Sequence, residues 1–138
     1  MNQPRQKICK ALGQEGCYFL CIVHLAEGLI SERIDAVQLY SVAIAAGLME
    51  EDCFVNEPAK LLMMMVPGQW EMVKYGMDYV PKDGEHEITR YERTTTAGVL
   101  CHFVCTDRRG NVVYDPLGGS LCVQFGKPVS KRVFRKVA

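Results

Sequence analysis

The sequence lacks an excess of charge of either sign, because sixteen Lys and Arg residues balance sixteen Asp and Glu residues. A protein that binds nucleic acid over a broad surface usually carries a basic excess. We therefore expect no nucleic-acid partner. The basic residues do gather in residues 130–136, where apolar residues partly alternate with charges. This pattern predicts a solvated edge strand rather than a binding patch.

Long apolar segments are also missing. The longest apolar runs are too short to span a bilayer, and the polar residues 1–7 contain no apolar signal-peptide region. We therefore expect a cytoplasmic protein with no membrane partner. Its cysteines number seven, which is odd. In this compartment most of them are expected to be reduced, buried thiols and not a disulfide framework.

The length of 138 residues predicts a single domain, residues 1–138. Apolar residues recur at helical spacing in the first half, and alternate in the second half. Helices are expected over residues 17–29, 34–46 and 58–65. Strands are expected over residues 70–75, 86–93, 99–106, 111–115, 120–125 and 129–136. Helices before strands predict an α+β fold, with N-terminal helices packed on a C-terminal antiparallel sheet.

One cysteine is placed to act as a nucleophile. Cys17 follows the loop-like residues 13–16 and begins the first predicted helix. The thiolate is the reactive form of cysteine, and a helix N-terminus favours negative charge. No other cysteine stands at a predicted helix start behind a glycine. The alternative is that Cys17 is an ordinary buried thiol.

Histidine is scarce, with only three residues. His24 lies roughly 10 Å of helical rise beyond Cys17, too far for direct contact, and is expected to be a core residue. His86 begins a polar strand and is expected to be exposed. His102 lies in an apolar strand, where an unpaired polar group is costly. We therefore predict that His102 pairs with Cys17 as its base.

Asp115 is the predicted group that orients the His102 ring. A two-residue turn at Arg109 and Gly110 would place Val104 opposite Asp115, and His102 diagonal to it on the same face. A three-residue loop would separate the two side chains onto opposite faces, unless a later bulge restored the register. The alternative is that Asp115 is a turn residue that ends a strand before Pro116.

Two motifs carry a resemblance to a known family. One is residues 13–21, the cysteine-bearing start of the first helix, and the other is residues 102–105 followed by residues 111–116. At these residues the sequence resembles the papain-like superfamily of cysteine peptidases. Within it, the sequence is most similar to the compact bacteriocin-processing type and to short phage and bacterial relatives.

The resemblance implies a papain-like α+β fold and a thiol hydrolase that needs no cofactor or metal. It implies Cys17 as nucleophile, His102 as general base and Asp115 as orienting residue. It also implies Gln14 as an oxyanion donor beside the Cys17 backbone N–H. Two positions depart from the family: Gln14 stands closer to the cysteine than usual, and Tyr18 occupies a position where relatives often have a small residue.

Two classes of function use this arrangement. The first is a hydrolase that cleaves a peptide or related amide bond in a peptide or protein substrate. The second is a non-catalytic protein-binding module on the same fold, with exposed apolar residues near Tyr18 or Trp70 as its contact surface.

A metal site is the third alternative. Cys17, Cys21 and His24 share one face of the first predicted helix, and His102 or Cys101 would supply a fourth ligand. Structural zinc sites more often use two cysteines separated by two residues on a turn.

Overall fold

The structure, a computed structural model, describes the backbone from residue 14 and the side chains from residue 16, in both cases to residue 138. Its helices are α2 (Gln14–Ile30), α3 (Ala36–Ala45), α4 (Pro58–Met63) and α5 (Leu121–Phe125). Its strands are β1 (Trp70–Tyr75), β2 (Glu85–Thr95), β3 (Gly98–Thr106), β4 (Val112–Tyr114) and β5 (Lys127–Lys136). Helix α2 begins three residues before the predicted start, so Cys17 is its fourth residue.

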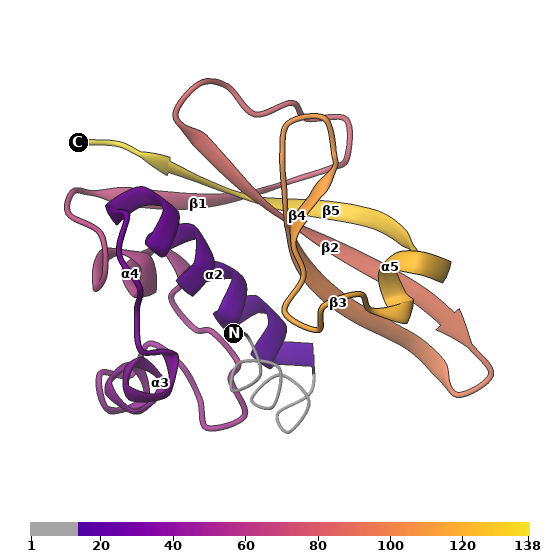
Figure 1. The fold of residues 1–138 in the computed structure, drawn as a ribbon, viewed down its shortest axis with the longest axis horizontal. Coiled ribbons are helices and arrows are strands. Elements are labelled where there is room, and N and C mark those ends of the chain that lie inside the picture. Colours follow the sequence, from indigo (N-terminus) through magenta and orange to yellow (C-terminus); the bar gives the residue numbers. More distant parts are fainter. Residues whose placement is uncertain (1–13) are drawn as a thin grey trace.

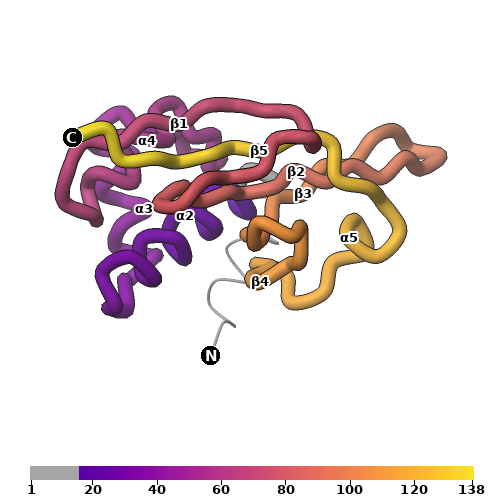
Figure 2. The backbone as a smooth tube through the Cα atoms, turned by 90° about the horizontal axis from the view of Figure 1, so that it is seen from above, coloured from indigo at the N-terminus to yellow at the C-terminus, as the bar shows by residue number. Residues whose placement is uncertain are grey.

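The strands form one open antiparallel sheet in the order β1-β5-β2-β3-β4. Helices α2, α3 and α4 gather beside one half of the sheet, and α5 lies at the other end (Figures 1 and 2). Phe19 and Ile22 of α2 are fully buried together with Ile88 and Phe134 of the sheet. The predicted α+β fold with an antiparallel sheet is therefore confirmed. No helix in the described part of the chain is long and apolar enough to cross a membrane.

The strand predicted over residues 120–125 is wrong, because this segment forms the short helix α5. The Ser120 hydroxyl accepts a hydrogen bond from the Val123 N–H at 3.3 Å, which is a helix N-cap. Cys122 then packs into a small cluster with Tyr91 and Val104. The apolar residues of this segment suit a strand as well as a single helical turn, so alternation alone did not distinguish the two.

The edge position predicted for residues 130–136 is also wrong. Strand β5 pairs with both β1 and β2 and therefore lies inside the sheet. Two of its charged residues have partners of opposite charge on the neighbouring strands. Lys131 pairs with Glu87 of β2, and Arg135 pairs with Glu71 of β1. Charges that looked solvated in the sequence are therefore matched across strands.

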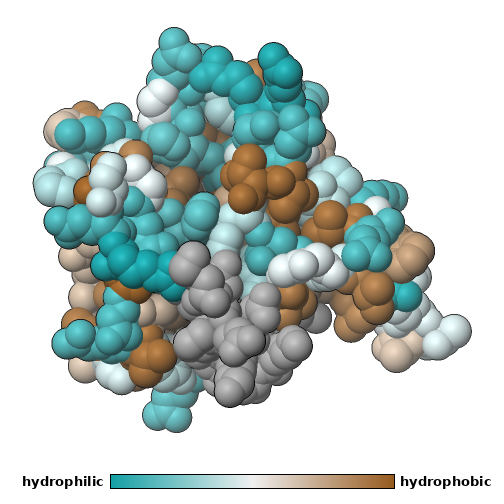
Figure 3. Space-filling view, in the orientation of Figure 1, coloured by the Kyte–Doolittle hydropathy of each residue, from teal (hydrophilic) through white to brown (hydrophobic). Residues whose placement is uncertain are grey.

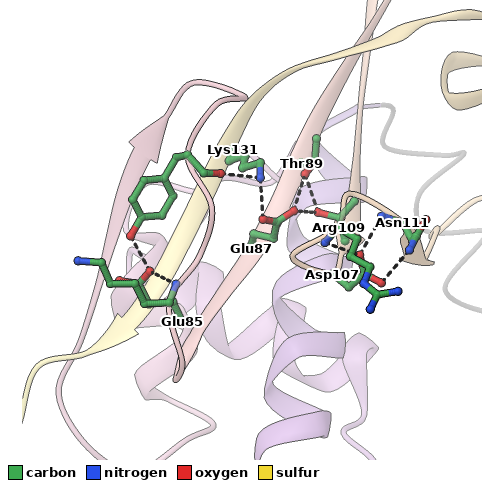
Figure 4. Close-up of polar contacts among 10 residues, drawn as sticks. Glu85, Glu87, Thr89, Asp107, Arg109, Asn111 and Lys131 are labelled. Carbon is green, nitrogen blue, oxygen red and sulfur yellow. Dashed lines mark hydrogen bonds and ion pairs between the residues drawn. The ribbon is translucent and has the colours of Figure 1, made fainter.

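The hairpin between β3 and β4 closes with a three-residue loop of Arg108, Arg109 and Gly110. The backbone N–H of Asp107 donates to the Asn111 carbonyl at 3.0 Å, and Gly110 has a positive φ of 85°. The Asp107 carboxylate accepts the backbone N–H groups of Arg109 and Asn111, each at 2.9 Å (Figure 4). Such a carboxylate bridge stabilises a tight turn.

A β-bulge follows this loop. Thr106 pairs with Val112, but Cys105 pairs with Tyr114, so Val113 is an extra residue in β4. The bulge shifts the register by one residue and reverses the parity change that a three-residue loop introduces. The residues after β4 therefore keep the facing expected for a two-residue turn.

Candidate active site

Three side chains from three separate segments meet beside the first turns of α2. The Cys17 Sγ lies 2.8 Å from Nδ1 of His102 in β3. The other ring nitrogen of His102, Nε2, lies 2.7 Å from Oδ1 of Asp115, which directly follows β4. The imidazole therefore bridges a thiol and a carboxylate. The structure brings together the three residues that the sequence analysis selected, in the predicted order of contact.

The packing of α2 on β3 sets the position of Cys17. One turn after Cys17, the Cys21 thiol donates to the Phe103 carbonyl at 3.4 Å, and the Cys105 thiol donates to the Cys21 carbonyl at 3.5 Å. Burial and the contact with Cys105 raise the pKa of Cys21 well above its usual value. Cys21 is therefore a neutral structural thiol. Its contacts fix the position of α2 on β3, and this position places Cys17 beside His102.

The position of His102 depends on the short length of β4. This strand pairs only with Cys105 and Thr106, so among the described strands the earlier residues of β3 pair with β2 alone. The free edge at His102 leaves room for the first turns of α2. The bulge at Val113 then puts Asp115 on the same side as His102.

Asp115 is held as a carboxylate. Besides His102, it accepts the backbone N–H groups of Leu117 and Ser120, each at 2.9 Å. Burial opposes ionisation, but the hydrogen bonds from His102 and Ser120 outweigh it and lower the pKa of Asp115 to about 2. Because an ionised carboxylate only accepts hydrogen bonds, the His102 proton lies on Nε2. The Nδ1 atom is then free to accept the thiol proton of Cys17.

The pair lies below the surface, since Cys17 and His102 are each 2% exposed. Neither side chain lines the described pocket of about 340 Å³. Its walls include Tyr18, the neighbour of Cys17, and also Cys101 and Phe103, the two neighbours of His102.

The side chain of Gln14 lies outside the described part of the structure, so its predicted oxyanion role stays a prediction. The contact surface of exposed apolar residues near Tyr18 or Trp70 stays a prediction, while these two side chains are themselves only 7% and 8% exposed. Tyr18 stacks on Phe103 with ring centroids 4.7 Å apart. The Trp70 indole N–H donates to the Pro67 carbonyl at 3.2 Å. Both rings belong to the core and are not available as a surface.

The other two histidines do not join the site. His24 stacks on Tyr114 with ring centroids 4.0 Å apart and nearly parallel planes. His86, expected to be exposed, is half-buried near Trp70, and burial lowers its pKa. Among residues 16–138, no three His, Cys, Asp or Glu side chains are arranged to hold a metal ion. The Cys17, Cys21 and His24 alternative therefore has no geometric support.

The structure also contains a second buried polar cluster that the sequence analysis missed, which we call the Glu87–Lys131 cluster. Lys131 Nζ donates to Glu87 Oε1 at 2.9 Å and to the Tyr79 carbonyl at 2.8 Å (Figure 4). The Thr106 hydroxyl donates to the other Glu87 oxygen and lies 2.6 Å from the Thr89 hydroxyl. Charged and apolar residues alternate around Lys131, and this pattern predicted an exposed lysine side chain. The cluster becomes visible only from the pairing of β5 with β2, which buries Lys131.

Apolar side chains on the surface form separate groups rather than one band. Figure 3 shows one brown group over β4 and another toward α5. Val113 of β4 is 58% exposed, and Leu121 and Phe125 of α5 are 55% and 69% exposed.

Comparisons with curated proteins and with solved structures gave no match to the chain. The profile of one protein family, described as "Protein of unknown function, DUF261", matches residues 1–136. This match covers nearly the whole sequence. The chain therefore belongs to the DUF261 family.

Proposed function

We propose that this protein is a cysteine hydrolase with a papain-like fold, which cleaves a peptide or related amide bond. One observation carries the proposal: the Cys17 Sγ lies 2.8 Å from His102 Nδ1, while His102 Nε2 lies 2.7 Å from Asp115. A nucleophile, a base and an orienting carboxylate in contact form the arrangement required for covalent acyl transfer. The position of Cys17 near the N-terminal end of α2 supports a thiolate there.

The proposed reaction has two halves. His102 Nδ1 takes the thiol proton, and the Cys17 sulfur attacks the substrate carbonyl carbon to form a tetrahedral intermediate. His102 then gives this proton to the amine nitrogen, the C–N bond breaks, and an acyl-enzyme remains. In the second half, water attacks the thioester carbonyl while His102 takes its proton, and the acid leaves as the thiol re-forms.

The remaining residues support this cycle. The Asp115 carboxylate orients the ring and stabilises the imidazolium that forms in each half. The oxyanion donors that belong to the proposal are the Cys17 backbone N–H and Gln14. The reaction requires a reduced thiol, and none of the six cysteines described by the structure is in a disulfide. This chemistry agrees with the cytoplasmic location that we propose.

Alkylation kinetics test the proposed thiolate. At about pH 6 an ordinary thiol is almost fully protonated and reacts slowly with iodoacetamide. We expect Cys17 to be labelled first among the seven thiols, as measured by peptide mass spectrometry. Half-buried Cys101 serves as the internal control. In a His102→Gln variant the labelling of Cys17 should slow at least tenfold, and equal rates in both proteins would contradict the proposed pair.

Hydrolysis itself is tested with a peptide mixture from a digested proteome. New peptide termini that form with the native protein, and not with the Cys17→Ala variant, would support the proposal. A mixture that stays unchanged with both proteins would contradict it.

Burial of Cys17 and His102, each 2% exposed, favours a second candidate, a non-catalytic protein-binding module on the same fold. This candidate predicts that the Cys17→Ala variant keeps every biological effect of the native protein. Loss of the effect in a Cys17→Ala variant that is still folded would rule it out.

A further inference from the structure

The outer face of α3 lacks the charges that the solvent side of a surface helix usually carries. None of the residues of α3 is Lys, Arg, Asp or Glu. The solvent-exposed residues of the helix and its C-cap are Val37, Gln38, Ser41, Val42, Ala45 and Ala46. Their spacing of one or three residues places them on a single face. In Figure 1, α3 lies apart from the sheet. The largest side chains of this face, Val37 and Val42, are 57% and 46% exposed.

Acidic residues precede and follow this helix. Residues 31–57 contain six acidic residues and a single basic residue, Arg33, which gives a local net charge of −5. The six acidic residues are all exposed: Glu32, Asp35, Glu50, Glu51, Asp52 and Glu57. The formal net charge of zero therefore conceals a negative region around α3 and a positive excess in the rest of the chain.

A tight turn holds three of these carboxylates beside α3, and we call residues 50–54 the acidic turn. The Glu50 N–H donates to the Phe54 carbonyl at 2.8 Å, and the Cys53 N–H donates to the Glu50 carbonyl at 2.9 Å. The hydroxyl of Tyr40 in α3 donates to the Glu51 carbonyl, which joins the turn to the helix. Phe54 is 51% exposed, so the turn presents an aromatic ring together with its carboxylates.

Cations within the described part of the chain leave most of this negative charge in place. Among residues 16–138, Glu57 is the only one of the six acidic residues in an ion pair, with Lys60 at 4.0 Å. Asp35 and Asp52 accept backbone N–H groups, which does not remove their charge. An apolar face flanked by uncompensated carboxylates is complementary to a partner that is both apolar and basic.

We infer that the outer face of α3 and the acidic turn bind a basic amphipathic helix of another protein. The apolar side of that helix packs on Val37 and Val42, and the small residues Ala45 and Ala46 allow the two helices to approach closely. Its Lys and Arg side chains lie opposite the acidic turn. The same carboxylates disfavour an anionic membrane surface as the partner. This inference does not depend on the proposed hydrolysis, because the surface contains none of the three residues of the candidate active site.

Binding of model helices tests the surface. Three short fluorescent peptides are titrated with the native protein: one has Leu on one helical face and Lys on the other, one has Glu in place of every Lys, and one is a scrambled Leu and Lys sequence without an apolar face. Fluorescence anisotropy is measured at low and at physiological salt. We expect the first peptide to have a Kd at least tenfold lower than either of the others, with a smaller advantage over the Glu peptide at higher salt. Equal affinity for the first peptide and either comparison peptide would overturn the inference.

A pair of valine variants tests the apolar contact. Val42→Ser should raise the Kd of the amphipathic Lys peptide at least threefold, because apolar surface is no longer buried in the complex. Val113→Ser is the matched control, since Val113 lies on β4 and is 58% exposed. The same Kd for the two variants would overturn the inference.

A pair of double variants tests the charge. Glu51→Gln with Asp52→Asn should raise the Kd of the same peptide at least threefold. Asp78→Asn with Asp83→Asn is the matched control, because it removes two exposed carboxylates from the loop between β1 and β2. An equal loss of affinity in both double variants would show that overall charge and not the acidic turn attracts the peptide, and would overturn the inference.

The oligomeric state of the native protein separates the two possible kinds of helix partner. Sedimentation velocity should show a monomer, which leaves the face open to another protein. A dimer that dissociates in the Val42→Ser variant, and not in the Val113→Ser variant, would show that a second copy of this chain covers the face. That result would overturn the inference.

Discussion

The Cys17, His102 and Asp115 site and the Glu87–Lys131 cluster are both buried polar arrangements built on β3 and its neighbours. In the first, the His102 ring joins a thiol and a carboxylate, and a proton can move between the thiol and the ring. In the second, the side chains of Lys131 and Glu87 are 4% and 2% exposed and form a direct ion pair. The Glu87 carboxylate is fully engaged by Lys131 and Thr106.

This difference separates two reasons for burying polar groups. A buried ion pair with all its hydrogen bonds made is tightly held, and removal of one partner leaves an uncompensated charge. The first site tolerates loss of the thiol, because the ring keeps its bond to the carboxylate. We therefore expect changes in the first site to affect activity and changes in the second to affect stability.

The largest effect is expected for Cys17→Ala. Hydrolysis should fall at least a thousandfold, because no other group in the site can form the covalent intermediate. The free energy of unfolding should change by only about 1 kcal/mol. The measurements are product formation and urea denaturation. Cys53→Ala is the control, a buried thiol between α3 and α4, and it should keep full activity.

Lys131→Met should have the opposite profile. The free energy of unfolding should fall by about 3–5 kcal/mol, because Glu87 is left buried without its partner. Urea denaturation measures this loss. The double variant Lys131→Met with Glu87→Gln removes both charges and should recover part of the stability. Equal stability of the single and double variants would show that charge pairing is not the cause.

A pH series should show the contribution of Asp115. Its folded pKa of about 2 lies below the unfolded value of about 3.9, so the carboxylate stabilises the fold above about pH 4, and this stabilisation is lost as the pH falls through 2. The contribution is about 2–3 kcal/mol. In urea denaturation from pH 6 to pH 2, the stability difference between native protein and Asp115→Asn should shrink. A difference independent of pH would contradict this role.

The smallest effect is expected for Thr89→Val in the Glu87–Lys131 cluster. It removes the hydroxyl that lies 2.6 Å from Thr106 but no charge. The free energy of unfolding should fall by about 1 kcal/mol, with hydrolysis unchanged. Thr94→Val on the same strand is the control, because Thr94 is exposed. A loss as large as that of Lys131→Met would mean that the hydroxyls and not the charges hold this cluster.

Local pattern determined much of this protein. The strand expected over residues 70–75 matches β1, and the helix over 34–46 matches α3 to within two residues at its start. Cys17 and His102 were selected for local reasons, a helix start behind glycine and a histidine in an apolar strand. These features follow from backbone preferences and periodicity, which act over a few residues.

Tertiary structure alone decided the rest. The central place of β5, the burial of Lys131 and the ring stack of Tyr18 on Phe103 depend on partners far apart in the chain. The contact between His102 and Asp115 depends on the Val113 bulge, which offsets a three-residue loop. Sequence reasoning could state this condition but not resolve it, because a register is fixed by cross-strand packing and hydrogen bonds rather than by the residues of one strand.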